Sequence, residues 1–252
     1  MFVWNEFIGK RGCDEIGSCV LKYIKCRNIK NRNLVILSDN CPGQNKNWTI
    51  AALWHHLVLT NTFDSIEHKF LLPGHSHLPC DRDFGRIEKC KRLHYQNVYS
   101  TEEWCEVIRK SNKKKPYLAT LMTQKYVLPI TNYTAEITKK TVCDKEKPLN
   151  FSQAVCMKFL ASQLHKMFLK HNVHDDFIEV SLKKRGRNSQ VRPLNQKYFQ
   201  TLSSNAHKVK DAQELLKFVP PIYHPFYLQL KISGTSDNTC QEENEDDIMD
   251  IE

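Results

Sequence analysis

The sequence predicts an α/β protein whose core contains two parallel strands. Two short runs, residues 33–39 and 68–74, contain continuous apolar stretches of strand length; the first is typical of a strand that is buried on both faces, and the second of another buried strand. Segments with helical patterns precede, separate and follow these two runs. Because the order is helix, strand, helix, strand, helix, we expect the two strands to be parallel and joined by a right-handed crossover.

The first two predicted helices differ in how much of their surface is buried. Between residues 14 and 26, apolar side chains recur at spacings of three and four, which predicts one buried face. Asp14 is expected to cap this helix at its start. Residues 48–60 are apolar almost all round, and this pattern predicts a helix enclosed by the core.

Two further helices are predicted from the residues at their ends. Residues 78–94 have Pro79 near the start, acids in the first turn and bases in the last, which suits the helix dipole. Residues 101–111 also carry acids in the first turn, with Thr101 as the expected cap. Ahead of all these elements, residues 2–4 are typical of the end of a strand.

The chain divides by composition into three predicted regions. Residues 1–112 are expected to hold the α/β core, and residues 113–232 a mixed α+β region. In the second region we expect short antiparallel strands, with helices near residues 153–171 and 211–219. The last region, residues 233–252, is acidic and is expected to be disordered.

The charge of the chain favours a polyanionic partner. There are 37 Lys and Arg residues against 28 Asp and Glu residues, which gives a formal net charge of +9. Eight of the acids follow Lys231, so 20 acids face 37 bases before them, and residues 1–236 carry about +17. We therefore expect nucleic acid, with DNA favoured, as the partner. The ordinary alternative is a solvated basic surface.

The sequence also predicts an intracellular protein, with the nucleus favoured over the cytoplasm. No stretch reaches the roughly 18 uninterrupted apolar residues of a membrane helix, so no membrane association is expected. The first residues lack the basic start and apolar run of a secretory signal. The ten cysteines are then expected to be reduced thiols. Nothing in the sequence predicts the oligomeric state.

Asp39 is the first candidate functional residue. It follows the first predicted strand, and ligands bind at the carboxyl ends of strands in open α/β sheets. The next residues, "NCPGQN", supply a turn and the amide groups of Asn40 and Gln44 just before a helix, where backbone N–H groups would meet an anion. In the ordinary alternative, Asp39 and Asn40 only shape the loop between strand and helix.

The segment after the second strand offers a partner for Asp39. His75 follows this strand, and Asp81 and Glu88 share one face of the next helix, whereas Asp83 points elsewhere. If the two strands are neighbours, this helix would bring an acid close to Asp39. Paired carboxylates in a basic protein suit Mg²⁺ or Mn²⁺, which would activate water for phosphodiester cleavage. The ordinary alternative is that the first-turn acids stabilise the helix dipole.

Zinc is a competing use of the same region. Cys41, His75, His77 and Cys80 form a nitrogen and sulfur set that would be able to reach tetrahedral coordination if folded together. Their spacing lacks the Cys-x-x-Cys or His-x₃-His pair of structural zinc sites, so the sequence disfavours zinc. The thiols are more typical of small core residues.

Four segments of the sequence resemble a known family. They are "FVWNE…RGCDEIGSCVLKYI", "VILSDNCPGQNKN", "KFLLPGHSHLPCDRDFGRIEK" and "LLKFVPPIYHPFY". Their order and spacing resemble the DUF7869 family, an uncharacterised family abundant in arthropod genomes and thought to derive from mobile elements. The resemblance covers roughly residues 2–230, and the first three segments are the specific ones.

This resemblance implies a ribonuclease-H-like core of the integrase or transposase type, in which three acids hold two divalent metals. Asp39 matches the second acid, at the end of the fourth strand of that fold. Asp81 fits the third acid best, and Glu88 is its rival. His75 would then contact the outer coordination shell or the substrate.

Two departures from the family pattern argue against activity. The acid of the first strand is expected upstream of Met1, because the chain begins at what resembles the third strand of the sheet. The family's Trp-Asp-Glu is Trp4, Asn5 and Glu6 here. We therefore expect an ancestrally metal-dependent DNA strand-transfer or nuclease protein that is inactive or incomplete. The alternative is a non-catalytic nucleic-acid-binding or interaction protein.

Overall fold

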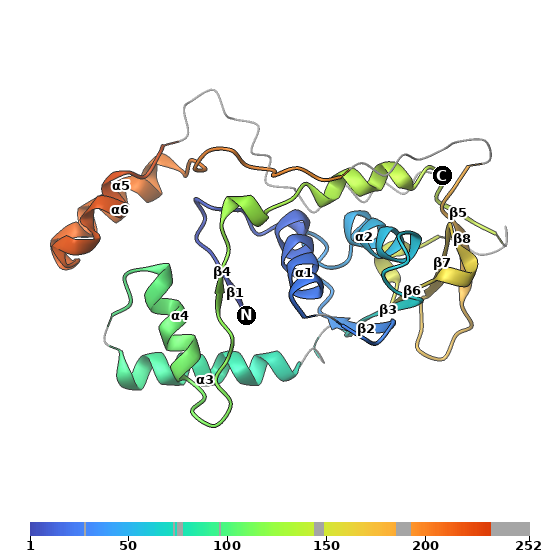
Figure 1. Cartoon of the computed structure of the whole chain (residues 1–252), viewed down its shortest axis with the longest axis horizontal. Coiled ribbons are helices and arrows are strands. Elements are labelled where there is room, and N and C mark those ends of the chain that lie inside the picture. Colours follow the sequence, from blue (N-terminus) through green and yellow to red (C-terminus); the bar gives the residue numbers. More distant parts are fainter. Residues whose placement is uncertain are drawn as a thin grey trace. The chain divides into compact units, whose positions relative to one another are not determined.

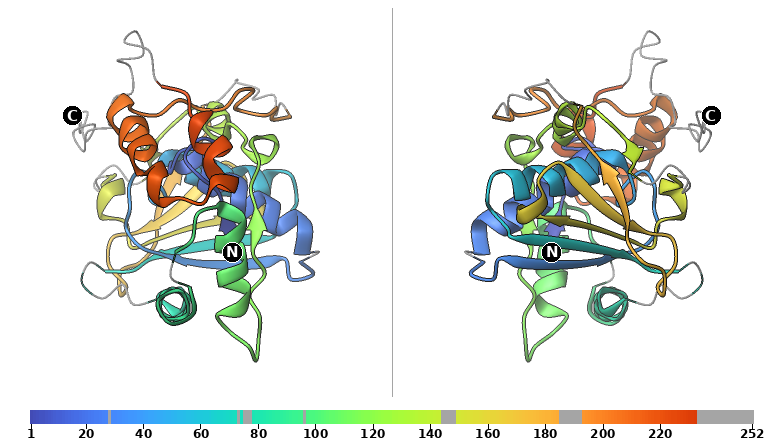
Figure 2. Two further views of the ribbon diagram at one scale, coloured as in Figure 1. Left: turned by 90° about the vertical axis from the view of Figure 1, so that its left-hand side faces the viewer. Right: turned by 90° about the vertical axis from the view of Figure 1, so that its right-hand side faces the viewer.

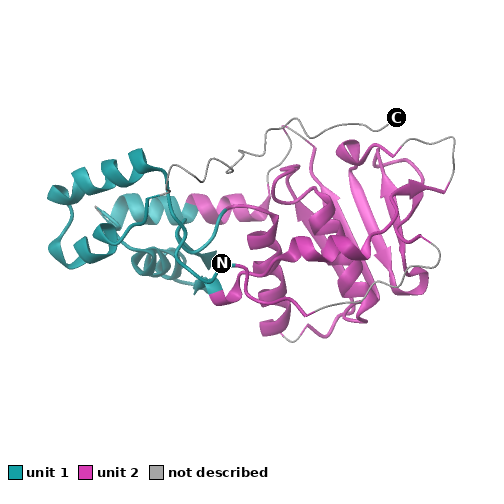
Figure 3. Cartoon of the chain, turned by 90° about the horizontal axis from the view of Figure 1, so that it is seen from above, with its two compact units in different colours: residues 1–10, 86–124, 198–252 teal, residues 11–85, 125–197 magenta. Residues whose placement is uncertain are grey.

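A computed structural model describes most of the chain as two compact units (Figures 1 and 3). The described residues are 1–27, 29–72, 74, 78–95, 97–143, 149–184 and 193–232. Unit 1 contains residues 1–10, 86–124 and the described residues from 198 onward; unit 2 contains residues 11–85 and 125–197. Neither unit is one continuous segment. In the part of the chain that the structure describes, no helix is long and apolar enough to span a membrane.

Unit 2 is built on a mixed six-stranded sheet. Its strand order is β2-β3-β6-β7-β8-β5 (Figure 1). The strands are β2 (Asn33–Ser38), β3 (Ser65–Phe70), β6 (Cys156–Leu160), β7 (Lys166–Lys170), β8 (Ile178–Ser181) and β5 (Thr141–Val142). β2 and β3 are parallel, with Ser38 opposite Phe70, and every other pairing is antiparallel. The predicted parallel pair and the predicted antiparallel strands are therefore both confirmed.

Helices α1 (Cys13–Arg27) and α2 (Trp48–Leu59) lie on one face of this sheet (Figure 2). α2 is enclosed by the core, as predicted, and begins at an Asn47 cap whose Oδ1 accepts from the Ile50 N–H at 2.9 Å. The core joins α2 to the inward side chains of the strands, which include Ile66, Met157 and Phe159. Each such side chain contributes about 1.5–3 kcal/mol by leaving water.

The start of α1 is fixed against a 3₁₀ helix, η2 (Ile130–Glu136). Asp14 lies inside the first turn, so the prediction that it caps the helix is wrong. Its Oδ1 instead accepts from the N–H and Oγ1–H of Thr131, at 2.7 and 2.9 Å, and its Oδ2 lies 2.8 Å from Lys197 Nζ. A Cβ on Gly17 would lie 2.9 Å from Ile130, so this close approach requires glycine.

Unit 1 contains a two-stranded parallel sheet and several helices. Its elements include β1 (Phe2–Val3), β4 (Thr120–Leu121), α4 (Thr101–Lys110), α5 (Ala206–Glu214) and α6 (His224–Leu228). β1 pairs with β4, so residues 2 and 3 do not continue into the large sheet as the resemblance implied. α4 is capped by Ser100 rather than by Thr101, because Ser100 has the extended backbone and its Oγ accepts from the Glu103 N–H. α3 (Pro79–His94) begins in unit 2 and ends in unit 1.

Short 3₁₀ helices complete the described chain. They are η1 (Gln124–Tyr126), η3 (Phe151–Gln153), η4 (Ala161–Gln163), η5 (Leu215–Phe218) and η6 (Pro221–Tyr223). The helix predicted near residues 211–219 is in fact α5 followed by η5.

Two further sequence predictions are wrong. β2 is not buried on both faces: it is an edge strand, and Val35 and Leu37 are 57% and 55% exposed. The helix expected near residues 153–171 is replaced by β6 and β7, whose inward side chains alternate with lysines. In β2 the outward side chains are apolar, so its sequence has no alternation between the two faces, whereas in β6 and β7 apolar residues alternate with lysines, as in a half-buried strand. The sheet takes strands from both sides of residue 112.

Candidate functional site

The loops after β2 and β3 meet at the carboxyl edge of the parallel pair. Asn40 Nδ2 donates to the Leu71 carbonyl at 2.6 Å, and the Leu71 N–H donates to the Ser38 carbonyl at 2.9 Å. The structure thus brings together the two strand ends that the sequence placed at one edge. Ligands commonly bind at this position in α/β sheets.

Asp39 is held within its own loop at this edge. Its Oδ1 accepts from Asn45 Nδ2 at 2.6 Å and from the Cys41 N–H at 3.3 Å, which is the pattern of an Asx turn. The Gln44 N–H joins the same turn by donating to the Cys41 carbonyl at 3.3 Å. Through these contacts Asp39 stabilises the conformation of its own loop.

Lys46 lies beside this loop and contacts Asn40. Its Nζ is 3.3 Å from Asn40 Oδ1 and 5.2 Å from the centre of the Phe70 ring. Burial lowers the pKa of Lys46, because the charged form is poorly solvated there. The edge therefore carries a partly desolvated cation next to the amide of Asn40.

The remaining predicted site residues are not assembled with Asp39 by any described contact. Asp81 Oδ2 accepts from the Leu78 N–H at 2.6 Å at the start of α3, as a first-turn acid does. Glu88 lies farther along α3, in the part that belongs to unit 1. His75 and His77 lie outside the described residues. The predicted contact of His75 and the zinc alternative, which uses both histidines, therefore fall outside the described part of the chain. Within the described ranges, no group of three or more His, Cys, Asp or Glu residues is arranged to hold a metal ion.

A chain of hydrogen bonds runs beneath the same edge, from Trp54 to Asp39. Trp54 Nε1 donates to His68 Nδ1 at 3.1 Å, so the proton of the neutral ring is on Nε2. His68 Nε2 then donates to Ser38 Oγ at 2.8 Å, and Ser38 Oγ donates to the Asp39 carbonyl at 2.8 Å. Burial lowers the pKa of His68 to about 3. This histidine is therefore a donor to Ser38 and not a base that activates it.

The face of the sheet opposite α1 and α2, which we call the open face, carries lysines and apolar residues in two rows. The strand register aligns Leu37, Lys69, Cys156 and Lys170 in the first row. It aligns Val35, Glu67, Lys158, Phe168 and Glu179 in the second row. Successive residues of a strand point to opposite faces, so all of these side chains lie on the side away from Ile66, Met157 and Leu169.

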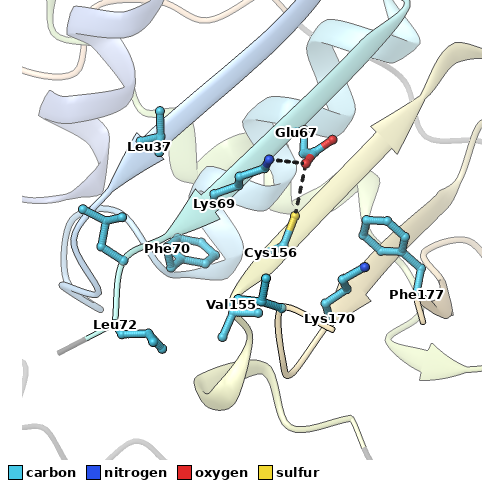
Figure 4. Close-up of a pocket in the computed structure, with 11 residues that line it drawn as sticks. Leu37, Glu67, Lys69, Phe70, Leu72, Val155, Cys156, Lys170 and Phe177 are labelled. Carbon is cyan, nitrogen blue, oxygen red and sulfur yellow. Dashed lines mark hydrogen bonds and ion pairs between the residues drawn. The ribbon is translucent and has the colours of Figure 1, made fainter. Parts of the chain in front are cut away.

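The first row leads into a pocket of about 410 Å³ at the carboxyl edge of β3 (Figure 4). Its walls are mostly apolar, with two lysines, one glutamate and one cysteine among them. The lining residues are Leu37, Glu67, Lys69, Phe70, Leu71, Leu72, Val155, Cys156, Lys170, Val173 and Phe177.

Glu67 is the centre of the polar contacts in this pocket. Its Oε1 lies 3.1 Å from Lys69 Nζ and 3.8 Å from Cys156 Sγ (Figure 4). Its Oε2 lies 3.7 Å from Lys158 Nζ. Burial, followed by the charge of Glu67, raises the pKa of Cys156 to about 11. The thiol is therefore protonated at neutral pH and is a poor nucleophile.

Lys170 is placed differently from the other lysine of the pocket. Its Nζ lies 4.7 Å from the centre of the Phe177 ring, and Phe177 is 36% exposed. Among the residues with described positions, no carboxylate forms an ion pair with Lys170. The pocket thus combines an aromatic ring, apolar walls and one cation whose charge is not neutralised by an acid.

Comparison with known proteins gives one match. The model of a domain of unknown function, DUF7869, matches residues 10–169, which is more than half of the chain. The chain belongs to the DUF7869 family. No curated protein and no solved structure matches it.

The DUF7869 match covers the carboxyl edge and only part of the pocket. Asp39, Asp81 and Cys156 lie inside the matched residues, whereas Lys170 and Phe177 lie just beyond them. Sequence reasoning missed the pocket altogether. The available signal was the alternation in "CMKFL" and "KMFLK", which places lysines on one face of two neighbouring strands.

Proposed function

We propose that this DUF7869 chain binds nucleic acid, with DNA favoured, through the open face of its sheet. The observation that supports this proposal most directly is the composition of that face. Among the described strand residues that project from it, the lysines are Lys69, Lys158, Lys166 and Lys170, and the acids are Glu67 and Glu179. Lysines that follow a sheet face contact phosphates, and nearby aromatic rings stack on bases.

The pairing of these charges leaves an excess of positive charge. Glu67 is shared by Lys69 and Lys158, and Glu179 Oε1 lies 2.8 Å from Lys166 Nζ. Four lysines against two glutamates give the face a formal charge of +2. The chain as a whole has a formal net charge of +9, so its long-range field also attracts a polyanion.

The proposal includes an ancestry in a mobile element and a ribonuclease-H-like core. The resemblance of the segments that contain Asp39 and Asp81 supports this ancestry, as does the position of Asp39 at the carboxyl edge of a parallel pair. In the ancestral enzyme Asp39 and Asp81, with Glu88 as the rival of Asp81, would be ligands of Mg²⁺ or Mn²⁺. A nucleic-acid partner also favours the nucleus as the location.

The described residues do not fit a working two-metal site in this chain. Asp39 Oδ1 already accepts two hydrogen bonds, and Asp81 Oδ2 accepts one at the start of α3. Among the residues that the structure places, no contact joins Asp39 to Asp81, and no group of three acids is arranged to hold a metal ion. We therefore propose binding without strand cleavage, and no catalytic step is assigned to the chain.

A titration against salt tests the proposal. The chain is mixed with a fluorescein-labelled 20-nucleotide single strand and with a 20-base-pair duplex, and anisotropy is followed at 50, 100 and 200 mM KCl. Phosphate contacts release counterions, so the logarithm of the association constant should fall linearly with the logarithm of the salt concentration. Absence of binding to both probes at 50 mM KCl would overturn the proposal. Nicking in the presence of Mn²⁺ that Asp39→Asn abolishes would overturn its non-catalytic part.

A further inference from the structure

We propose that the pocket at the carboxyl edge of β3 binds a single unpaired nucleotide of the nucleic-acid strand, with the base against Phe177 and a phosphate on Lys170. This inference rests on the proposed function and adds a substrate preference to it. The shared chemistry is a flat heteroaromatic group that carries a phosphate. A free nucleotide has the same chemistry, and the experiment below separates the two sources.

The size and walls of the pocket suit one base. Its volume of about 410 Å³ lies within the roughly 300–1,000 Å³ range of sites for small ligands. Leu72 and Phe177 supply apolar and aromatic surface on which a base is able to pack (Figure 4), and Val173 adds to the apolar lining. A base stacked inside a duplex has no free ring face, so an unpaired nucleotide enters without the cost of unstacking.

The charges of the pocket require an anionic group on the ligand. Lys69 is already paired with Glu67 at 3.1 Å, whereas the described contact of Lys170 is with the Phe177 ring at 4.7 Å. Lys170 is therefore the cation available to a phosphate. Because Lys170 sits over the ring that would hold the base, one ligand with a ring and a phosphate satisfies both groups.

The pocket is also placed where a strand on the open face would end. Leu37, in its wall, lies two residues before Asp39, and Leu71, also in its wall, accepts a hydrogen bond from Asn40 through its carbonyl. Lys158 on β6 and Lys166 on β7 continue the positive surface of the open face. A nucleic-acid strand that follows these lysines would deliver its terminal nucleotide to the carboxyl edge.

The experiment compares labelled duplexes with and without an unpaired end. Anisotropy at 100 mM KCl is measured for a 20-base-pair blunt duplex and for the same duplex with three-nucleotide overhangs at the 3′ or the 5′ end. Stacking of a base on an aromatic side chain contributes about 1–3 kcal/mol, so we expect one overhang to bind about 5- to 150-fold more tightly than the blunt duplex. Equal affinity for all three duplexes would overturn the inference and leave the proposed function standing. Loss of binding to all probes would overturn the proposed function itself.

Variants of the pocket residues test whether the pocket causes the preference for an overhang. Phe177→Ala should abolish the overhang preference, Phe177→Trp should retain it, and Lys170→Gln should reduce it. The matched control is Phe218→Ala with Lys217→Gln, because Lys217 Nζ lies 5.1 Å from the Phe218 ring and neither residue lines the pocket. Retention of the preference in a folded Phe177→Ala variant, checked by circular dichroism, would contradict the assignment.

Competition with free nucleotides shows whether the pocket binds a free nucleotide or the unpaired end of a strand. Adenosine monophosphate at millimolar concentration should remove the advantage of the overhang and leave binding of the blunt duplex unchanged. Adenosine, which lacks the phosphate, should compete at least tenfold more weakly. Equal competition by the two compounds would overturn the role of Lys170. If the monophosphate binds more tightly than the overhang duplex, the pocket is a site for free nucleotides and the inference is wrong.

Discussion

Trp54 Nε1 donates a hydrogen bond to Nδ1 of the buried His68 at 3.1 Å, and this contact fixes the tautomer of the imidazole. The remaining ring proton then points at Ser38, and Ser38 in turn holds the carbonyl of Asp39. The carboxyl edge of the parallel pair is therefore supported from below by a neutral, directional chain of hydrogen bonds. Its neutrality has a measurable consequence for stability.

Stability should fall as pH drops below the ordinary pKa of histidine. The pKa of His68 is lowered from 6.5 to about 3 in the folded chain, so between these values only the unfolded chain binds the proton. The free energy of unfolding should therefore decrease by about 1.4 kcal/mol for each pH unit below 6.5. Urea unfolding at pH 7.5, 6 and 5 measures this slope. His68→Gln keeps an acceptor and a donor but does not titrate, so a slope unchanged in that variant would refute the assignment to His68.

The buried carboxylate of Glu136 should stabilise the fold at neutral pH, and its contribution should start to change only at a lower pH than the effect of His68 does. Glu136 Oε1 lies 2.8 Å from His56 Nδ1, and Glu136 is 3% exposed. Burial alone would raise the pKa of Glu136, but its contacts with His55 and His56 hold it below the usual value. Its contribution is therefore present above about pH 4.5 and is lost as pH falls through the lowered folded value.

Substitution of this acid should be costly at neutral pH. Glu136→Gln removes the charge that faces two histidines, and we expect a loss of about 3 kcal/mol in the free energy of unfolding at pH 7. Glu106→Gln is the matched control, because Glu106 is exposed and its solvent-screened pair with Lys110 Nζ at 3.3 Å should contribute little to stability. Similar losses in the two variants would show that the buried cluster does not stabilise the fold.

Asp39 should behave as a loop residue. Asp39→Asn retains Oδ1 as an acceptor for Asn45 and should change the free energy of unfolding by less than about 0.5 kcal/mol. Asp39→Ala removes the acceptor and should cost about 1–2 kcal/mol. Thermal unfolding of the two variants tests this ranking. A titration with Mn²⁺ that stabilises the unsubstituted chain, but neither variant, would instead establish Asp39 as a metal ligand.

Removal of the acidic residues at the end of the sequence should strengthen nucleic-acid binding. Residues 233–252 contain eight acids and no base, so their deletion changes the formal net charge from +9 to about +17. We expect affinity for a single strand at 50 mM KCl to rise about tenfold, and the difference to shrink at 200 mM KCl because salt screens the charges. Anisotropy titrations of the two chains provide the comparison. An affinity that falls on deletion would contradict this prediction.

The fold was predictable where burial alone decides the pattern. Residues 48–59 are apolar on every side, and α2 is correspondingly enclosed by the core. The run from residue 33 also forms the predicted strand, but the predicted burial of both its faces is wrong. Apolar Val35 and Leu37 look like core residues in sequence, whereas β2 is at the edge of the sheet and they project from the open face. No local pattern reports which strand is at an edge.

The candidate site was predictable only in part. Parallel pairing brings Asn40 to Leu71, as the rule for strand ends implies, and this placement could be argued from the order of elements. The alignment of Leu37, Lys69, Cys156 and Lys170 could not, because it depends on the register between strands far apart in sequence. The tautomer of His68 likewise depends on Trp54, fourteen residues away, and has no signature in sequence.

Nucleic-acid binding by the open face is tested most directly by the salt dependence of single-strand binding in two charge-matched variants. One carries Lys69→Gln, Lys158→Gln and Lys170→Gln on the open face, and the other carries Lys113→Gln, Lys114→Gln and Lys115→Gln in unit 1. Each phosphate contact contributes about 0.7 to the slope of log K against log salt for a single strand. Binding through the open face predicts a slope reduced by about 2 in the open-face variant and by less than about 0.5 in the control. Equal reductions in both variants, or none in the first, would contradict it.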